Sequence, residues 1–300
     1  MKEKIDFIGI GSLRSGTTWL ARCLEEHPQI LFSAQKTEKE LHFFNSPYGI
    51  LTAGWNKKYN RLGWSNYHKG IEWYLGQFPS SQKGKIRGEF TTIYLSDQKT
   101  AERIKKHFPE AKILVILRNP VEMIYSMHWH YQIAVELTIP RDFDQALKEG
   151  LYLDKGLYYK HLKKYFQLFP RKNIHVMIFD DLEHHPQQLI KDLYRFLKVK
   201  ESFIPSVLHQ KIWGARTEKF KILKKIGYIV INSLNRLGFK KIASQILWSI
   251  PLRKLYKKIN VVPLKYPPMD SKVKNRLKKF YRSDIESLEK LIRRDLSNWK

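Results

Sequence analysis

The sequence predicts an α/β fold: an open parallel sheet of about five strands, flanked by helices in the manner of P-loop proteins. Apolar strand-like runs alternate with helical patterns along the first two hundred residues, as a parallel sheet requires. The run 112–117, KILVIL, is continuously apolar after its first residue, which is typical of a strand covered on both faces. A glycine-rich loop follows the first run. Ligands of such sheets bind outside the carboxyl ends of the strands, so we expect the site there.

Each expected strand rests on a short apolar run bounded by turn or helix signals. The first run is followed by a helical stripe that stops before Pro28, because a residue preceding proline is pushed out of the helical region. Gly88 weakens the third run without abolishing it. The five strands are expected at 6–10, 29–33, 85–90, 112–117 and 173–179.

Two helical segments are expected towards the end of the chain. Pro186 suits the first turn of one helix, where its missing N–H costs nothing. The final segment carries an apolar stripe over 273–281, and Ser283 with Glu286 forms a capping box. This box predicts that one helix ends and another begins near residue 283.

The composition favours one domain over residues 1–300. With 300 residues and 43% hydrophobic content, the chain can bury one sizeable core. Its single cysteine, Cys23, excludes an internal disulfide framework and a cysteine-rich zinc module. Cys23 lies on an apolar helical stripe, so we expect a small core residue. The first apolar run is too short for a signal peptide, which favours a cytoplasmic location.

The net charge of +27 favours an anionic partner. The segment 213–258 holds twelve Lys or Arg residues and one acid, Glu218, interleaved with apolar residues. It contains no uncharged apolar run near the ~18 residues that a membrane span needs. We expect a basic amphipathic helical insert over 213–262. An ordinary subdomain, a lid, a peripheral membrane contact and a docking face for an acidic acceptor all remain open.

The stretch GIGSLRSGTTWL, residues 9–20, places a glycine loop between a strand and a helix. Its GxxxxG spacing matches a phosphate loop, but Thr17 stands where nucleotide triphosphatases have lysine. Backbone N–H groups at 15–18 are expected to hold an anion at the helix N-terminus. Arg14 supplies a cation, and no magnesium seat is evident. The loop therefore suits an anion that needs less neutralisation than a triphosphate.

A second anion site is expected where the run 112–117 ends. Arg118 follows that strand, Asn119 is a good N-cap, and Pro120 suits a first helical position. An arginine beside a helix N-terminus is suited to phosphate. Ser126 comes about two turns later, and spacing alone does not bring it to this site.

These motifs resemble those of sulfotransferases that use 3′-phosphoadenylyl sulfate (PAPS). GSLRSGTTWL is similar to their 5′-phosphosulfate loop, and ILVILRNPVEMIYSMHWH is similar to their second nucleotide motif. KELHFF and KYPPMD resemble the Golgi heparan sulfate sulfotransferase branch. The resemblance implies PAPS as co-substrate and no metal. The residues implied to bind PAPS are Arg14, Ser15, Gly16, Thr17, Thr18, Arg118, Ser126 and Lys265.

The same resemblance implies Glu40 as the general base and Arg14 as the group that balances charge on the leaving nucleotide. His42 could orient Glu40 or be the base itself, and Glu89 is a third candidate. Phe90 stands where the heparan enzymes have lysine, which leaves one cation fewer at the transferring group. Glycan, lipid and small alcohol all remain open as acceptors.

Two other functions compete with this interpretation. A P-loop kinase or nucleotidase would use the same loop, although the lysine it needs is missing. A nucleic-acid or membrane-surface binding protein would explain the charge, although the motifs favour a nucleotide co-substrate over nucleic acid. Metal binding is disfavoured, because His128 and His130, two apart on a helix, point to different faces.

Overall fold

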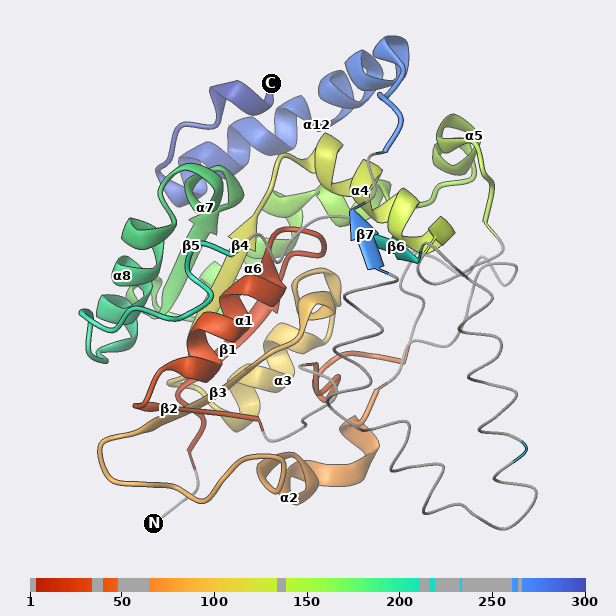
Figure 1. Ribbon diagram of the computed structural model, residues 1–300. Coiled ribbons are helices and arrows are strands. Elements are labelled where there is room, and N and C mark those ends of the chain that lie inside the picture. Colours follow the sequence, from red (N-terminus) through yellow and green to blue (C-terminus); the bar gives the residue numbers. More distant parts are fainter. Residues whose placement is uncertain are drawn as a thin grey trace.

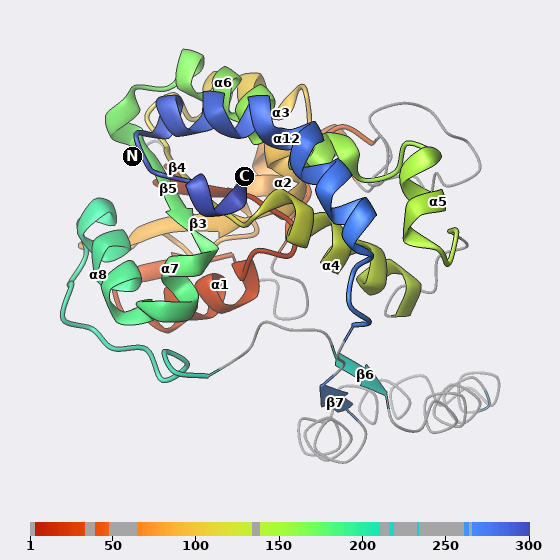
Figure 2. The same cartoon turned by 90° about the horizontal axis from the view of Figure 1, so that it is seen from above.

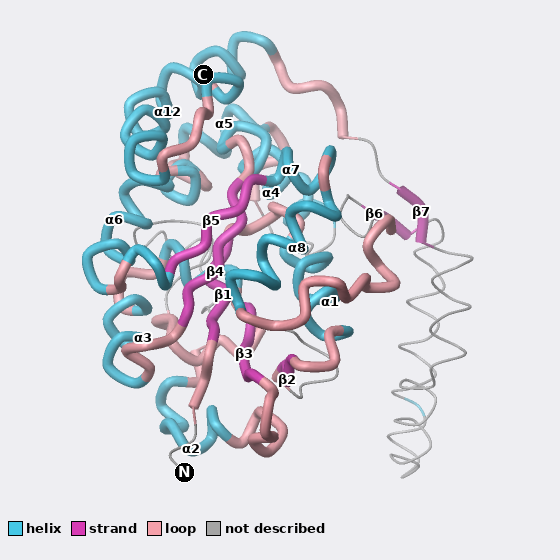
Figure 3. The backbone as a smooth tube through the Cα atoms, turned by 90° about the vertical axis from the view of Figure 1, so that its left-hand side faces the viewer, coloured by secondary structure: helices cyan, strands magenta, loops and turns pink. Residues whose placement is uncertain are grey.

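The computed structural model describes residues 4–33, 40–47, 65–133, 139–210, 216–218, 233, 261–263 and 266–300. A five-stranded parallel sheet forms its centre, in the order β2-β3-β1-β4-β5 (Figures 1 and 3). The predicted fold class is confirmed, and each expected strand is present within one residue at either end. The strands are β1 Phe7–Gly11, β2 Ile30–Phe32, β3 Ile86–Phe90, β4 Lys112–Leu117 and β5 Ile174–Ile178.

Helices cover both faces of the sheet, because alternate side chains of each strand point to opposite faces. Ile8 and Ile10 join one apolar cluster, whereas Phe7 joins a second one. Figure 2 shows α12 and α6 on one side of the sheet and α1, α7 and α8 on the other. The first cluster is completed by α3 Thr100–His107, α4 Pro120–Ile133, α6 Tyr158–Leu168 and α12 Ser271–Ile292, and the second by α1 Thr17–Glu26, α7 Phe179–His184 and α8 Pro186–Leu197.

Shorter elements connect these layers. A 3₁₀ turn at Thr92–Ser96 follows β3 directly and lies at the carboxyl edge of the sheet. The others are α2 Gly70–Leu75, α5 Phe143–Lys148 and 3₁₀ turns at Tyr67–Lys69, Leu153–Gly156, Arg171–Asn173 and Ser297–Trp299.

The structure places two residues singled out in the sequence, Cys23 and Phe90, in the core. Cys23 is fully buried, as expected, and burial raises the pKa of its thiol. Phe90 is also fully buried. It packs against Gly9 so closely that a Cβ there would lie 2.0 Å from the Phe90 ring. Phe90 therefore belongs to the core, and its side chain takes no part in the carboxyl-edge site.

The expected helix break at residue 283 is wrong. Helix α12 runs without interruption from Ser271 to Ile292, and Ser283 lies in its interior. Its N-cap is Asp270, whose carboxylate accepts hydrogen bonds from the N–H groups of Lys272 and Val273. The buried stripe of this helix passes straight through residue 283, so packing overrides the local capping signal.

The basic segment at 213–262 lies mostly outside the described residues. Its two ends are described: β6 Arg216–Glu218 pairs in antiparallel fashion with β7 Val261–Pro263. The chain therefore departs and returns at adjacent points. Within the described parts of the chain, no helix combines the length and the apolar character that crossing a membrane requires.

Candidate active site at the carboxyl edge of the sheet

The glycine loop leaves β1 and is tied to the neighbouring strand β4. Ser12 donates its backbone N–H to the carbonyl of Ile116 at 2.8 Å, and its hydroxyl lies 2.6 Å from that of Ser15. The Ser15 hydroxyl in turn donates to the carbonyl of Leu13 at 3.1 Å. Both hydroxyls therefore shape the loop from inside, and Ser15 offers a ligand its backbone N–H.

Helix α1 begins directly after this loop. Its N-cap residue is Gly16, which has no side chain to accept hydrogen bonds from the first N–H groups. Gly16 adopts a left-handed φ of 82°, and a Cβ there would lie 2.7 Å from Cδ1 of Leu182. No side chain caps the helix at this position, and its first turn contains no acid. Helix N-termini carry N–H donors and partial positive charge. The start of α1 therefore suits an anion, as the sequence predicted for Gly16, Thr17 and Thr18.

Arg14 links the loop to helix α4. Its Nε donates to Oγ of the buried Ser126 at 3.3 Å. The structure therefore brings together two residues that spacing alone could not, because α4 passes beside the loop. Arg14 itself has a left-handed φ of 56°, a conformation that non-glycine residues seldom adopt.

Arg118 also contacts Arg14. We call these two arginines, together with the Ser126 hydroxyl to which Arg14 donates, the cationic cluster. One guanidinium nitrogen of Arg118 donates to the carbonyl of Arg14 at 3.4 Å, and another lies 3.3 Å from Oε2 of Glu122. The guanidinium stacks over the Phe179 ring at 4.6 Å. Its Nε is buried and finds no hydrogen-bond partner among the described residues.

The start of α4 follows the sequence prediction. Asn119 accepts a hydrogen bond from the N–H of Val121 at 3.0 Å, and Pro120 is the first helical residue. This cap fixes where α4 begins and so where Arg118 leaves the sheet.

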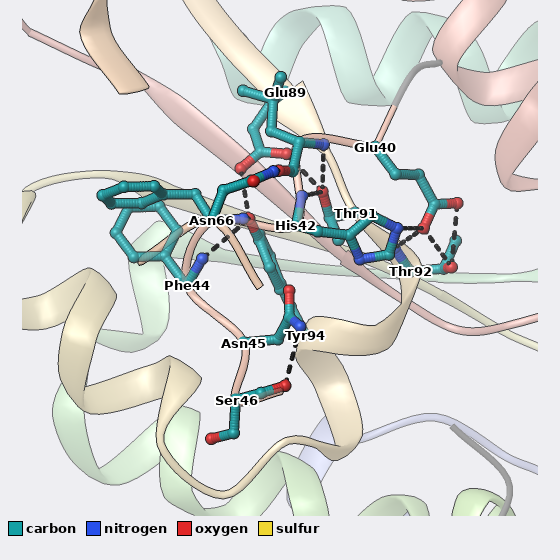
Figure 4. Close-up of polar contacts among 12 residues, drawn as sticks. Glu40, His42, Phe44, Asn45, Ser46, Asn66, Glu89, Thr91, Thr92 and Tyr94 are labelled. Atoms are coloured by element: carbon teal, nitrogen blue, oxygen red, sulfur yellow. Dashed lines mark hydrogen bonds and ion pairs between the residues drawn. The ribbon is translucent and has the colours of Figure 1, made fainter. Parts of the chain in front are cut away.

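Glu40 lies on the loop 40–46, which follows β2, and Thr92 holds its carboxylate (Figure 4). Thr92 donates its backbone N–H to Oε2 at 3.1 Å, and its hydroxyl lies 3.0 and 2.9 Å from the two carboxylate oxygens. His42 Nε2 is 3.7 Å from Oε2 of Glu40, too long for a hydrogen bond. The Nδ1 atom of His42 is buried without a partner in the described part of the chain. Of these two neighbours, Thr92 and not His42 therefore orients the Glu40 carboxylate by hydrogen bonds.

Glu89 is enclosed. Its side chain is 0% exposed and accepts hydrogen bonds from Thr91 at 2.6 Å, Tyr94 at 3.0 Å and Tyr74 at 3.1 Å. Burial raises the pKa of Glu89 to about 7, while these hydroxyls oppose the shift and the charge of Glu40 adds to it. A general base must contact the proton that it removes. This enclosure disfavours Glu89 as the base and leaves Glu40 and His42.

The charges of Glu40 and Arg14 affect the pKa values of side chains in the last turn of α4. Burial raises the pKa of Tyr131, the charge of Glu40 raises it further, and Arg14 opposes the shift. Burial, followed by the charge of Arg14, lowers the pKa of His130 to about 4. Glu40 also lies beside the glycine loop, because its partner Thr92 packs against that loop: the Thr92 carbonyl would be 2.9 Å from a Cβ at Gly11.

Lys265, the remaining residue implied to bind PAPS, lies outside the described residues. The sequence reasoning missed Thr91, Thr92 and Tyr94, which hold the Glu40 loop. Their signal was present, since three hydroxyl side chains follow β3 within TTIY at the carboxyl edge.

No metal-binding group is evident in the described ranges, where no three His, Cys, Asp or Glu side chains gather suitably. His128 Nε2 lies 3.1 Å from the carbonyl of Arg141, and its Nδ1 is 3.4 Å from the Tyr152 hydroxyl. It is a satisfied core histidine.

Comparison with known proteins identifies the family to which the chain is similar. The family described as the sulfotransferase domain matches residues 4–228. A bifunctional heparan sulfate N-deacetylase/N-sulfotransferase of Drosophila melanogaster is 26% identical over 222 residues, covering 65% of this chain and 20% of that protein. The membrane-associated sulfotransferase kil1 of Dictyostelium discoideum is 35% identical over 131 residues, covering 43% and 23%.

The chain thus spans about a fifth of the length of these curated relatives. The crystal structure of a sulfotransferase from Alicyclobacillus acidocaldarius superposes with a TM-score of 0.66 at 23% identity, over 99% of both chains, and shares the fold. The family match covers most of the chain and includes the glycine loop, Arg118 and Glu40. The chain belongs to the sulfotransferase family.

Proposed function

We propose that this chain transfers a sulfuryl group from PAPS to a hydroxyl or amine of an acceptor. The observation that carries the proposal is the juxtaposition at one sheet edge of the uncapped start of α1, the cationic cluster and the oriented carboxylate of Glu40. A nucleotide with anionic groups at both ends needs two cationic contacts, and a base beside them completes a transfer site.

The residues present fit such a nucleotide. The start of α1 and Arg14 would hold the 5′ end, because no side chain caps the N–H groups of the first helical turn. Arg118 and Ser126 would hold the 3′-phosphate. The buried and unpartnered Nε of Arg118 is the kind of donor that a phosphate satisfies. Lys265 stays an expectation from the resemblance.

In this mechanism Glu40 accepts the proton of the attacking hydroxyl or amine. The new bond forms between the acceptor oxygen or nitrogen and sulfur, while the bond from sulfur to the bridging phosphate oxygen breaks. That oxygen takes the electron pair, and Arg14 offsets the charge that grows there. The two donors of Thr92 aim the Glu40 carboxylate. The residues therefore supply positioning, proton removal and charge balance.

A labelled-PAPS transfer screen against glycans, lipid extracts and small alcohols tests the proposal. We expect Glu40→Gln to keep its affinity for adenosine 3′,5′-bisphosphate and to lose turnover by about 10²–10⁴-fold, the usual contribution of a general base. Glu183→Gln, at an exposed glutamate on α7, is the matched control and should behave as wild type. Turnover that survives in Glu40→Gln would remove Glu40 from the base role and leave His42.

Two results would support the competing functions. Equal thermal protection by ATP and by adenosine 3′,5′-bisphosphate would favour a kinase or nucleotidase. Steeply salt-dependent binding to DNA or anionic vesicles that survives Arg118→Ala, with no transfer to any acceptor, would favour a basic surface-binding protein.

A further inference from the structure

The loop that carries Glu40 is held through its backbone by two side-chain hydroxyls. Thr91 Oγ1 accepts the N–H groups of Leu41 and His42 at 3.1 and 3.4 Å. The Tyr94 hydroxyl accepts the next two N–H groups, those of Phe43 and Phe44, at 2.9 and 3.2 Å. Four consecutive N–H groups of a segment without regular secondary structure thus depend on two oxygen atoms (Figure 4).

The buried carboxylate of Glu89 determines which way these hydroxyls point. A hydroxyl has one hydrogen to donate, and an ionised carboxylate can only accept. Thr91 and Tyr94 each donate their hydrogen to Glu89, at 2.6 and 3.0 Å. Their lone pairs are therefore left facing the loop. Because Glu89 is wholly enclosed, water does not compete for these bonds.

We infer that Glu89 is a positioning residue for Glu40: through the hydroxyls of Thr91 and Tyr94 it fixes the backbone of residues 41–44. The inference rests on the proposed function in that it takes Glu40 as the base. Its structural half, the ordering of the loop by Glu89, stands independently.

The same turn also holds the Glu40 side chain. Thr92, adjacent to Thr91, donates to the Glu40 carboxylate, while Thr91 holds the two residues that follow Glu40. The Glu40 carboxylate and the loop that bears it are thus both held by the adjacent residues Thr91 and Thr92 at the end of β3. Catalytic groups need placement within about half an ångström, so loosening the loop should reduce turnover more than nucleotide affinity.

Replacement of Glu89 by glutamine puts an NH₂ donor in the place of one carboxylate oxygen that accepts from these hydroxyls. The amide brings two N–H donors into contact with hydroxyls that already donate. At least one hydroxyl must turn, and the loop N–H groups that it accepted lose their partner. The chain offers a matched control in Tyr74, whose hydroxyl donates to the same Oε1 atom at 3.1 Å, whereas the N–H groups of residues 41–44 bond to Thr91 and Tyr94. Tyr74→Phe keeps its ring packing against Phe43.

The experiment combines amide hydrogen exchange with kinetics on the full chain at a pH of about 8, above the pKa of about 7 of Glu89, so that its carboxylate is ionised and only accepts. In Glu89→Gln and Tyr94→Phe, we expect the amides of residues 41–44 to exchange about tenfold faster than in wild type, which corresponds to the loss of one hydrogen bond. We expect kcat to fall about tenfold in both variants at an unchanged dissociation constant for adenosine 3′,5′-bisphosphate. Tyr74→Phe should change the exchange of these amides less than either.

Wild-type exchange at residues 41–44 in Glu89→Gln would overturn the inference, as would equal loosening by Tyr74→Phe and Tyr94→Phe. If Glu89→Gln does not fold, Thr91→Val and Thr91→Ser decide. The amides of Leu41 and His42 must exchange faster in Thr91→Val than in Thr91→Ser, because only serine keeps the accepting hydroxyl. Equal exchange rates in the two variants would overturn the inference. Absence of sulfuryl transfer by the wild-type chain would instead reject the proposed function, since the exchange rates do not depend on it.

Discussion

At the scale of single residues, Thr92 makes the most direct contact with the proposed base. It gives Glu40 two different donors, a backbone N–H and a side-chain hydroxyl. We expect Thr92→Val, which keeps only the N–H, to lower kcat about tenfold with little change in nucleotide affinity, because one hydrogen bond to a carboxylate is lost. Thr92→Ser should restore turnover. Steady-state kinetics with labelled PAPS measures both, and a serine variant as slow as the valine variant would show that the hydroxyl does not matter.

Arg118 is expected to distinguish nucleotides by their 3′ group. Arg118→Ala should weaken binding of the 3′-phosphorylated nucleotide by about 10–100-fold, since charge-assisted hydrogen bonds contribute about 1.5–3 kcal/mol. The 3′-hydroxyl analogue should lose far less. Isothermal titration calorimetry gives both affinities, with Arg282→Ala on the exposed face of α12 as the control. Equal losses for both nucleotides would contradict the assignment of Arg118 to the 3′-phosphate.

The sequence identified the residues that belong to short motifs and missed those that depend on tertiary packing. Arg14 and Gly16 stand out because a glycine loop between a strand and a helix has a recognisable spacing. The contact of Arg14 with Ser126 exists only because α4 crosses beside the loop. Tyr94 holds a backbone N–H fifty residues earlier in the chain, and no local pattern marks that pairing.

At the scale of elements, α12 shows how packing decides where a helix begins. Its buried positions, Leu277, Tyr281, Ile285 and Leu288, keep helical spacing through residue 283. A capping signal worth about 1 kcal/mol cannot break a helix whose apolar stripe stays buried on both sides of it. The strands were predicted more accurately, because a run such as 112–117 is short, continuous and bounded by turns.

This leads to a paired prediction for α12. Asp270→Ala should lower the free energy of unfolding by about 1 kcal/mol, because two N–H groups at the helix start lose their acceptor. Ser283→Ala, at an exposed position inside the helix, should be neutral or stabilise slightly, because alanine has the higher helix propensity. Urea unfolding of both variants measures the difference. A larger loss for Ser283→Ala would mean that the helix begins again at residue 283 in solution.

At the scale of the whole molecule, Glu89 links folding stability to pH. Its pKa is raised to about 7 from an ordinary value of 4.5, so the folded state holds this proton more tightly than the unfolded state. The resulting stabilisation is complete below about pH 4.5 and is lost as the pH rises through about 7. Glutamine does not titrate.

The stability of wild type minus that of Glu89→Gln should therefore fall between about pH 4.5 and 7 and level off above that range. Urea unfolding at several pH values measures this difference. Parallel stability curves for the two proteins would show that burial does not perturb Glu89 in this way.

The short ribbon of β6 and β7 has a consequence for how the molecule tolerates changes in length. Glu218 and Val261 are register partners in an antiparallel pair, so a two-residue hairpin turn could join them directly. A chain in which Asn-Gly replaces residues 219–260 should retain the five-stranded sheet, with circular dichroism and adenosine 3′,5′-bisphosphate binding close to those of the parent. The ribbon of β6 and β7 would then be a site at which sequence can be inserted, deleted or exchanged without disturbing the five-stranded sheet and the nucleotide site at its edge.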